Sequence, residues 1–301
     1  MQFSSNVVII GGGITGYLLA LILSRANISV ILVEEKRRIP GIKHFDGRAY
    51  ALSFSSINVL KATQLWDQIK DHSQEIRKMK IYSDNERYPI NSPLLEFKKA
   101  DLDGENIAFM VEDRFLTALL YDCLCDNIQI IDNNMAVGFK KKGSKVIVDL
   151  IKGQTISADL IVAADGKNSK TARHFRLPRL GWKYNQTSLV CAVSHEYPHE
   201  GIAYQKFYSS GPFAILPLKG NKSSLVWTES TSDAEEIHKL PDKDYLKFLA
   251  RKFGDFLGDI SLLGNKNSFE LDLGFAESII GDRLALVGDS AQNIHPLAGQ
   301  G

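Results

Sequence analysis

The chain has 301 residues, of which 44% are hydrophobic and 24% are charged, and its formal net charge is +1. This length is sufficient for a large core and usually gives two domains, and the composition is that of a globular protein. A charge balance so close to neutral gives no basic field for nucleic acid, so no nucleic-acid partner is expected.

The cysteines and the apolar segments point to a reducing compartment. Cys123, Cys125 and Cys191 form no Cys-x-x-Cys pair, which favours buried thiols. The apolar segment 18–33 is interrupted by Arg25 and Asn27, and its pieces are shorter than the roughly 20 residues of a membrane span. The N-terminus also lacks the basic region of a signal peptide, so we expect a cytoplasmic protein.

The N-terminal residues carry the pattern of a βαβ unit. Residues 7–10 and 29–33 are apolar and β-branched, which predicts two buried strands, and residues 17–24 between them predict a helix. The first turn reads Gly-x-Gly-x-x-Gly at Gly11, Gly13 and Gly16, and Glu34 follows 23 positions after Gly11.

This unit predicts a dinucleotide site. Gly11 would allow the tight turn, Gly13 a close approach of the backbone to a pyrophosphate, and Gly16 close helix–strand packing. The helix N-terminus would offer N–H groups to the phosphates, and Glu34 would accept hydrogen bonds from ribose hydroxyls. FAD and NAD share the ADP half, so the pattern does not choose between them, and a glycine turn without a ligand is the alternative.

Two arginines follow the βαβ unit in places that suit a ligand. Arg48 lies in a turn, where its side chain could contact a phosphate or a flavin edge, or could simply be exposed to solvent. Arg114 lies in the first turn of a helix predicted over residues 115–125, where the helix dipole disfavours a cation. We therefore expect a ligand or an acidic partner for Arg114, with a solvated side chain as the alternative.

The centre of the chain predicts a hairpin and then a change of architecture. Residues 145–150 and 154–158 read as a hairpin, and residues 160–164 as a buried strand that ends at Asp165 and Gly166. That turn is either a ligand site at a strand end or an ordinary Asp-Gly turn. Residues 181–263 are rich in aromatic residues and predict an antiparallel sheet over a pocket, with a helix over 242–256.

The last residues follow another strand-like segment, 284–287. Gly288 and Asp289 begin a turn, and Pro296, Gly299, Gln300 and Gly301 close the sequence. A strand followed by such a turn is suited to wrapping backbone around a ligand.

Taken together, these motifs resemble the class A FAD-dependent aromatic hydroxylases, which have the p-hydroxybenzoate hydroxylase fold. The segments 46–53, 211–218 with Val226 and Trp227, and 295–301 most resemble the ubiquinone-biosynthesis hydroxylases. The resemblance covers the whole chain. It implies an α/β fold in which a Rossmann-like FAD-binding domain carries an inserted antiparallel-sheet substrate domain.

The resemblance also implies domain boundaries. Residues 1–74, 105–179 and 271–301 would form the discontinuous FAD-binding domain, and residues 75–104 and 180–270 the substrate domain. The family continues beyond the Gly-Gln-Gly turn into helices, so the C-terminal helices are expected to be absent from this chain, which leaves its activity open.

The implied activity is a monooxygenase of ubiquinone biosynthesis. FAD would be reduced by NADH or NADPH, and a flavin C4a-hydroperoxide would hydroxylate the ring of a polyprenylated phenol. Such a substrate implies peripheral contact with the inner face of the membrane and with other ubiquinone-synthesis enzymes. The alternatives are a truncated, non-catalytic flavin-binding protein and another flavin oxidoreductase of the same fold.

The resemblance assigns site residues but no catalytic base and no metal. The residues implied to bind FAD are Gly11, Gly13, Gly16, Glu34, Arg48, Arg114, Asp165, Gly166, Asp289, Pro296, Gly299, Gln300 and Gly301. Among these, Asp165 and Gly166 would serve both FAD and the reduced pyridine nucleotide, and Asp289 would bind the ribityl chain.

Overall fold

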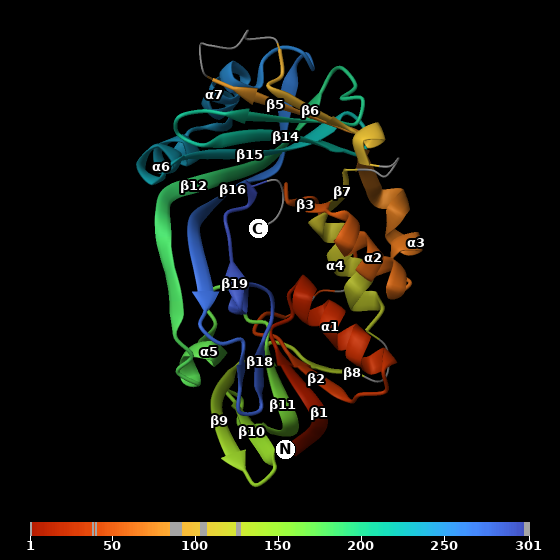
Figure 1. The fold of residues 1–301 in the computed structure, drawn as a ribbon, viewed down its shortest axis with the longest axis vertical. Helices are drawn as coiled ribbons and strands as arrows, with labels where there is room; N and C mark the ends of the chain where they lie inside the picture. The colour runs from red at the N-terminus through yellow and green to blue at the C-terminus, as the bar shows by residue number, and fades with distance from the viewer. Residues whose placement is uncertain are drawn as a thin grey trace.

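The computed structural model describes residues 2–37, 39, 41–84, 92–102, 107–124 and 128–297. The described chain forms two eight-stranded sheets and one three-stranded sheet. Figure 1 shows the first large sheet at one end of the molecule and the second at the other, with β12 (Arg179–His195) and β16 (Ile260–Ala276) running between them.

The first sheet has the order β17-β18-β11-β1-β2-β8, in which β18, β11, β1, β2 and β8 are parallel and β17 is antiparallel to β18, and β10 and β9 extend it from β11. β1 lies between β2 and β11 and is parallel to both. The strands are β1 (Gln2–Ile10), β2 (Val30–Val33), β8 (Ile128–Ile131), β9 (Ala136–Lys142), β10 (Lys145–Leu150), β11 (Thr155–Ala163), β17 (Ile280–Gly281) and β18 (Leu284–Leu286). The predicted βαβ unit is therefore confirmed, with α1 (Ile14–Arg25) as its helix.

Alternate residues of β1 and β2 fill two separate cores. Ile9 and Leu32 pack with Tyr17 and Leu21 of α1 on one face. The intervening residues, such as Val8, point to the other face of the sheet, where they pack against β9, β10 and α5 (Lys170–His174). Burial on both faces explains why these strands read as continuous apolar runs.

The predicted hairpin forms, but its second half is longer than expected. Residues 155–163 make one strand, β11, instead of the two separate strands expected over 154–158 and 160–164. β11 pairs with β10 through its first half and with β1 along nearly its whole length. The continuous pairing with β1 leaves no place for a break.

A small sheet and three helices cover the α1 side. The sheet order is β3-β7-β4, with β3 (Ala49–Leu52), β7 (Ala108–Glu112) and β4 (Ser73–Ile76). The helices are α2 (Phe54–Ala62), α3 (Trp66–Ile69) and α4 (Asp113–Asp122), and their apolar faces join the core that includes Tyr17.

The second large sheet has the order β19-β16-β12-β15-β14-β13-β5-β6. Its remaining strands are β5 (Lys78–Ser83), β6 (Leu95–Lys98), β13 (Ile202–Phe207), β14 (Pro212–Leu218), β15 (Lys222–Ser230) and β19 (Gln292–Asn293). The strands β12 to β16 pair antiparallel, as predicted, whereas β5 joins the sheet parallel to β13. β5 reaches this edge from a distant part of the chain and not through a hairpin.

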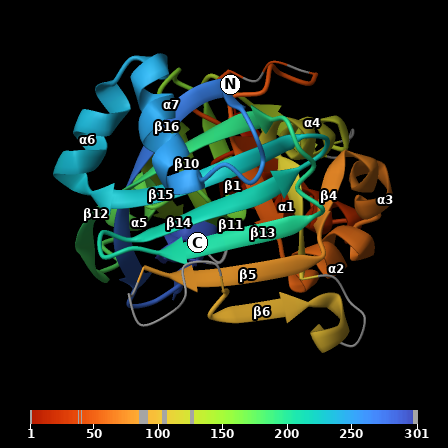
Figure 2. The same ribbon diagram turned by 90° about the horizontal axis from the view of Figure 1, so that it is seen from above.

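Two helices cover one face of the second sheet, as seen from above in Figure 2. α6 (Thr231–Lys239) contributes Ala234, and α7 (Asp242–Phe253) contributes Tyr245 and Leu249. They pack against Trp227 and Phe213, which are nearly fully buried. The opposite face of β12–β15 is therefore free to line a cavity.

β12 and β16 are 17-residue strands that connect the two ends of the molecule. Their register shifts between Lys183 and Gln186, where Asn185 has a φ of 56°. Such a bulge bends a strand, and Figure 1 shows both strands turning together. The division into two domains stays a prediction, and β16 continues across the expected boundary at residue 271. No helix in the described part of the chain is long and apolar enough to cross a membrane.

Candidate functional site

The glycine turn connects β1 to α1. Gly11 has a φ of +109°, and a Cβ there would lie 2.3 Å from the carbonyl oxygen of Ala164. A Cβ on Gly16 would lie 2.0 Å from the carbonyl oxygen of Gly11. Both positions therefore require glycine for the turn itself, with or without a ligand.

Gly13 differs from its neighbours because its surroundings are empty. A Cβ built on Gly13 meets no atom within 4 Å, whereas one on Gly12 would lie 2.9 Å from Glu34 Oε2. Gly13 is the N-cap of α1 and has ordinary extended backbone angles. The fold therefore does not need glycine at this position, but a pyrophosphate lying against the helix N-terminus would.

Glu34 lies beside the turn, at the end of β2. Its Oε2 accepts a hydrogen bond from the backbone N–H of Gly12 at 2.6 Å, and its Oε1 accepts one from Lys36 at 2.9 Å. Two carboxylate oxygens have about four acceptor sites, so capacity remains for ribose hydroxyls. Glu34, Gly12 and Gly13 line one cavity of about 340 Å³, which we call the glycine-loop cavity.

Arg48 also lines the glycine-loop cavity. Its guanidinium bonds to Asp46 at 2.8 Å and to Asp113 at 3.0 Å, and Asp113 also accepts a hydrogen bond from Tyr50 at 2.8 Å. Burial and the Asp113 carboxylate raise the pKa of Tyr50, which keeps its phenol protonated. Arg48 and Tyr50 also line a second cavity, so they lie where the two cavities meet.

Arg114 has the acidic partner that its helix position predicted. Its Nε lies 2.7 Å from Glu112 Oε2, and its guanidinium stacks over Phe115 at 4.6 Å. Glu112 is buried and also pairs with Lys222 of β15 at 3.3 Å. Arg114 lines the glycine-loop cavity and is held in place by a carboxylate that also ties α4 to the second sheet.

Asp165 is engaged within the fold. Its Oδ2 accepts hydrogen bonds from the N–H and hydroxyl of Thr171, at 3.0 and 2.9 Å, and its Oδ1 accepts one from Ser290 at 3.2 Å. Gly166 follows with a φ of +81° and open space around it. Through these hydrogen bonds, Asp165 connects the end of β11 to α5 and to the 288–290 turn. Its predicted contact with FAD and pyridine nucleotide stays a prediction.

The turn at residues 288–290 reaches the start of α1. Gly288 has a φ of +59°, and a Cβ there would lie 3.1 Å from Thr15 Oγ1. Arg179 fastens this turn to β12 by donating to the carbonyl oxygens of Ser290 and Asp289, at 3.0 and 3.1 Å, and to the side chain of Asn293.

Asp289 lines the second cavity, and its carboxylate makes no hydrogen bond to another described residue. Burial raises its pKa, against the opposing effect of Arg179 and Lys167. A half-buried carboxylate with unused acceptor capacity suits the hydroxyls of a ribityl chain.

Residues 294–297 continue along the second cavity. His295 meets Tyr184 edge to face at 5.4 Å, and its buried Nδ1 has no hydrogen-bond partner among the described residues. Burial lowers the pKa of His295, so its ring is neutral near pH 7. Pro296 follows on the same wall, whereas Gly299, Gln300 and Gly301 lie outside the described residues.

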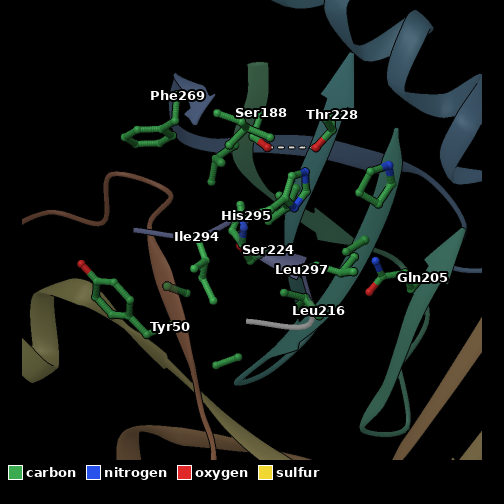
Figure 3. Close-up of a pocket in the computed structure, with 18 of the residues that line it drawn as sticks. Tyr50, Ser188, Gln205, Leu216, Ser224, Thr228, Phe269, Ile294, His295 and Leu297 are labelled. Carbon is green, nitrogen blue, oxygen red and sulfur yellow. Dashed lines mark hydrogen bonds between the residues drawn. The ribbon is translucent and has the colours of Figure 1, made fainter. Parts of the chain in front are cut away.

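The second cavity, of about 570 Å³, lies between the second large sheet and these C-terminal residues, and we call it the sheet cavity. Figure 3 shows side chains from the sheet, from β3 and from residues 294–297 around it. Most of its walls are apolar. The polar residues of the sheet that line it are Ser188, Gln205, Ser224 and Thr228 on β12, β13 and β15, and Glu270, Asp272 and Asn293 on β16 and β19.

Sequence reasoning missed Arg179, Lys167 and the polar residues of the sheet wall. Lys167 pairs with Asp272 of β16 at 2.7 Å and so joins the Asp-Gly turn to the connecting strands. In β13, β14 and β15, alternate side chains point to opposite faces of the sheet, so the sequence separates the two faces of each strand. It does not show which face the helices cover and which faces a cavity.

Comparison with known proteins identifies the family. A family model described as "FAD binding domain" matches residues 4–301. The ubiquinone hydroxylase UbiL of Rhodospirillum rubrum is 34% identical over 301 residues, which cover 99% of this chain and 68% of that protein. The 3-demethoxyubiquinol 3-hydroxylase of Escherichia coli is 28% identical, with 99% and 75% covered.

Solved structures share the fold at lower identity. The p-nitrophenol 4-monooxygenase PnpA of Pseudomonas putida superposes with a TM-score of 0.81 at 17% identity, covering 99% of this chain and 76% of PnpA. PqsL of Pseudomonas aeruginosa, a probable FAD-dependent monooxygenase, gives 0.80 at 20% identity, with 99% and 82% covered. The chain belongs to the FAD-binding-domain family and, within it, to the FAD-dependent aromatic hydroxylases of the ubiquinone-hydroxylase branch.

Proposed function

We propose that the chain hydroxylates the aromatic ring of a polyprenylated phenol in ubiquinone biosynthesis, with NADH or NADPH and dioxygen as co-substrates. The observation that carries the proposal is the meeting of two cavities at Arg48 and Tyr50. One runs along the glycine turn, and the other is a largely apolar space under a sheet. A long dinucleotide and a ring substrate would need this combination.

The residues of the glycine-loop cavity would hold the ADP half of FAD. The open face of Gly13 and the N-terminus of α1 would receive the pyrophosphate, and Glu34 would bind ribose hydroxyls. Arg48 and Arg114 would donate hydrogen bonds to FAD through the N–H groups that their acidic partners leave open. Their acidic partners hold both side chains in place, so little conformational entropy would be lost on binding.

The residues of the sheet cavity would position the flavin and the substrate. Asp289 would bind the ribityl chain, and His295 and Pro296 would lie beside the flavin ring system. When bound and reduced, FAD supplies the activation of dioxygen. The apolar walls exclude water from the ring that receives the oxygen atom.

The chemistry of the substrate extends the proposal to the membrane. A polyprenyl chain partitions into a bilayer, so the enzyme would meet its substrate by peripheral contact with the inner face of the membrane, where other ubiquinone-synthesis enzymes would also act.

Oxygen-isotope labelling tests the proposed reaction. The purified chain, reconstituted with FAD, would be given NADH or NADPH, a short-chain prenylated phenol and ¹⁸O-labelled dioxygen. The expected product is a ring with one added hydroxyl group that carries ¹⁸O. An unlabelled or reduced product would show a different flavin oxidoreductase, and a protein that retains flavin but gives no product would show a non-catalytic one.

A further inference from the structure

Gln205 stands out on the cavity face of the second sheet. It lies on β13, opposite Ala214 of β14 and beside Ile81 of β5. The neighbouring Tyr204 points to the helix-covered face, so the alternation of the strand turns Gln205 toward the sheet cavity. Figure 3 shows its amide beside Leu297 on the cavity wall.

The side chain of Gln205 is buried and has no hydrogen-bond partner among the described residues. The residue is only 4% exposed, and its side chain makes no hydrogen bond to another described residue. Its neighbours Ala203, Ala214 and Leu216 offer no polar side-chain atom. The amide is not among the polar atoms that the protein encloses completely, and it lines the sheet cavity, so its donors and its acceptor are open to a ligand bound there.

Two of the other polar groups of this wall are already paired, whereas Ser224 also lines the cavity and can donate only through one short hydroxyl. The hydroxyls of Ser188 and Thr228 bond to each other at 2.9 Å, as the dashed line in Figure 3 shows. The two basic side chains that line the described part of the cavity, Arg48 and Lys167, are both ion-paired. No unpaired cation therefore faces the sheet side to balance a carboxylate.

We propose that Gln205 is a specificity-determining residue that recognises a hydroxyl group on a neutral aromatic ring. A carboxamide both donates and accepts, so it can pair with a phenol hydroxyl in either sense. The amide carries no positive charge that could balance the carboxylate of a benzoate. The ring would therefore reach this site without a carboxyl group, after any decarboxylation of its precursor.

This inference takes from the proposed function only the class of ring ligand, so binding is measured without turnover. The ligands are a short-chain prenylated phenol, the matching prenylbenzene without the hydroxyl, and the matching prenylated hydroxybenzoate. Each is titrated into the FAD-reconstituted wild type and into Gln205→Met, which keeps the length of the side chain but removes the amide.

The wild type is expected to bind the phenol about 10-fold more tightly than the prenylbenzene, a ratio typical of one hydrogen bond in a buried site, and to bind the acid weakly. Gln205→Met should lose the preference for the phenol while its affinity for prenylbenzene stays the same. Gln205→Asn, which keeps the amide but is one methylene shorter, should retain part of the preference.

The stability of the ligand-free protein supplies a second measurement. Because the amide has no partner among the described residues, Gln205→Met should not lower the melting temperature. Gln186→Leu is the matched control, since the amide of Gln186 donates to the carbonyl oxygen of Ser210 at 2.8 Å and this residue does not line the sheet cavity. It should lower the melting temperature and leave phenol binding unchanged.

Two results would overturn the inference: an unchanged preference for the phenol in Gln205→Met, or a fall in melting temperature as large as that of Gln186→Leu. Failure of the proposed hydroxylation would leave this binding test intact, because no step in it depends on turnover.

Discussion

Two buried histidines, His195 at the end of β12 and His199 four residues later, form hydrogen bonds through both ring nitrogens. His195 Nδ1 lies 2.7 Å from the carbonyl oxygen of Tyr197 and must donate to it, while its Nε2 lies 3.1 Å from the Ser223 hydroxyl. The Nδ1 of His199 accepts from the N–H of Gly201 at 3.0 Å. The two rings lie 5.7 Å apart, so charging one disfavours charging the other.

The stability of the protein should therefore decrease in mild acid. Burial lowers the pKa of His195, and the His199 ring adds to this effect. The unfolded chain, in which histidine has a pKa of about 6.5, then binds the proton more readily than the folded chain. The stabilisation is complete above that pH and is lost as the pH falls through the folded pKa.

Urea unfolding at a series of pH values between neutral and mildly acidic checks this prediction. The loss of unfolding free energy in acid should be smaller in His195→Gln than in the wild type. The exposed His72 is the control, and His72→Gln should keep the wild-type slope. Equal slopes in all three proteins would contradict the assignment.

At the scale of the element, the bulge in β12 determines how the two ends of the molecule are connected. Asn185 is exposed and has a φ of 56°, and the pairing with β16 changes register around it. Because its exposed side chain contributes little to the stability of the bulge, the main requirement at this position is the left-handed backbone conformation. Glycine adopts this conformation without cost, whereas a β-branched residue does not.

Two substitutions separate the backbone requirement from the side chain. Asn185→Val should lower the free energy of unfolding by about 1–2 kcal/mol, since a left-handed conformation costs that much for an ordinary residue. Asn185→Gly should leave it unchanged, as measured by the same urea titration. If valine were tolerated as well as glycine, the bulge would not be a fixed part of the fold.

Elements formed by neighbouring residues could be predicted from the sequence, and those formed by distant ones could not. The βαβ unit, the hairpin at β10 and the helix after Arg114 rest on local periodicity and turn chemistry. The parallel pairing of β5 with β13 joins segments more than 100 residues apart in the sequence, and no local pattern records it.

The same limit applies to the site. Gly11 and Gly16 carry a motif, and the structure gives each a steric reason. Arg179 belongs to no motif, and its importance depends on the tertiary position of the turn at Asp289. Gln205 could be placed on a strand, but its missing hydrogen-bond partner is visible only when the surrounding walls are known.

At the scale of the whole molecule, three distant segments build one continuous site. The glycine turn, the Arg48 turn and the 288–297 segment converge between the two large sheets (Figure 1). In the proposed arrangement, one FAD molecule would extend from the glycine-loop cavity into the sheet cavity. Gly13 is the position best suited to test this arrangement, because a Cβ there meets no protein atom within 4 Å.

The most direct test is the flavin content of the purified, FAD-reconstituted chain, measured by absorbance in the wild type, Gly13→Val and Gly281→Val. Gly281 lies on the exposed β17, where a Cβ would make only ordinary contacts with Leu284, so this variant controls for the added valine. We predict one FAD per chain in the wild type and in Gly281→Val, and a Gly13→Val that is folded but colourless. Full flavin retention by a folded Gly13→Val, or a wild type that binds no FAD, would contradict this prediction.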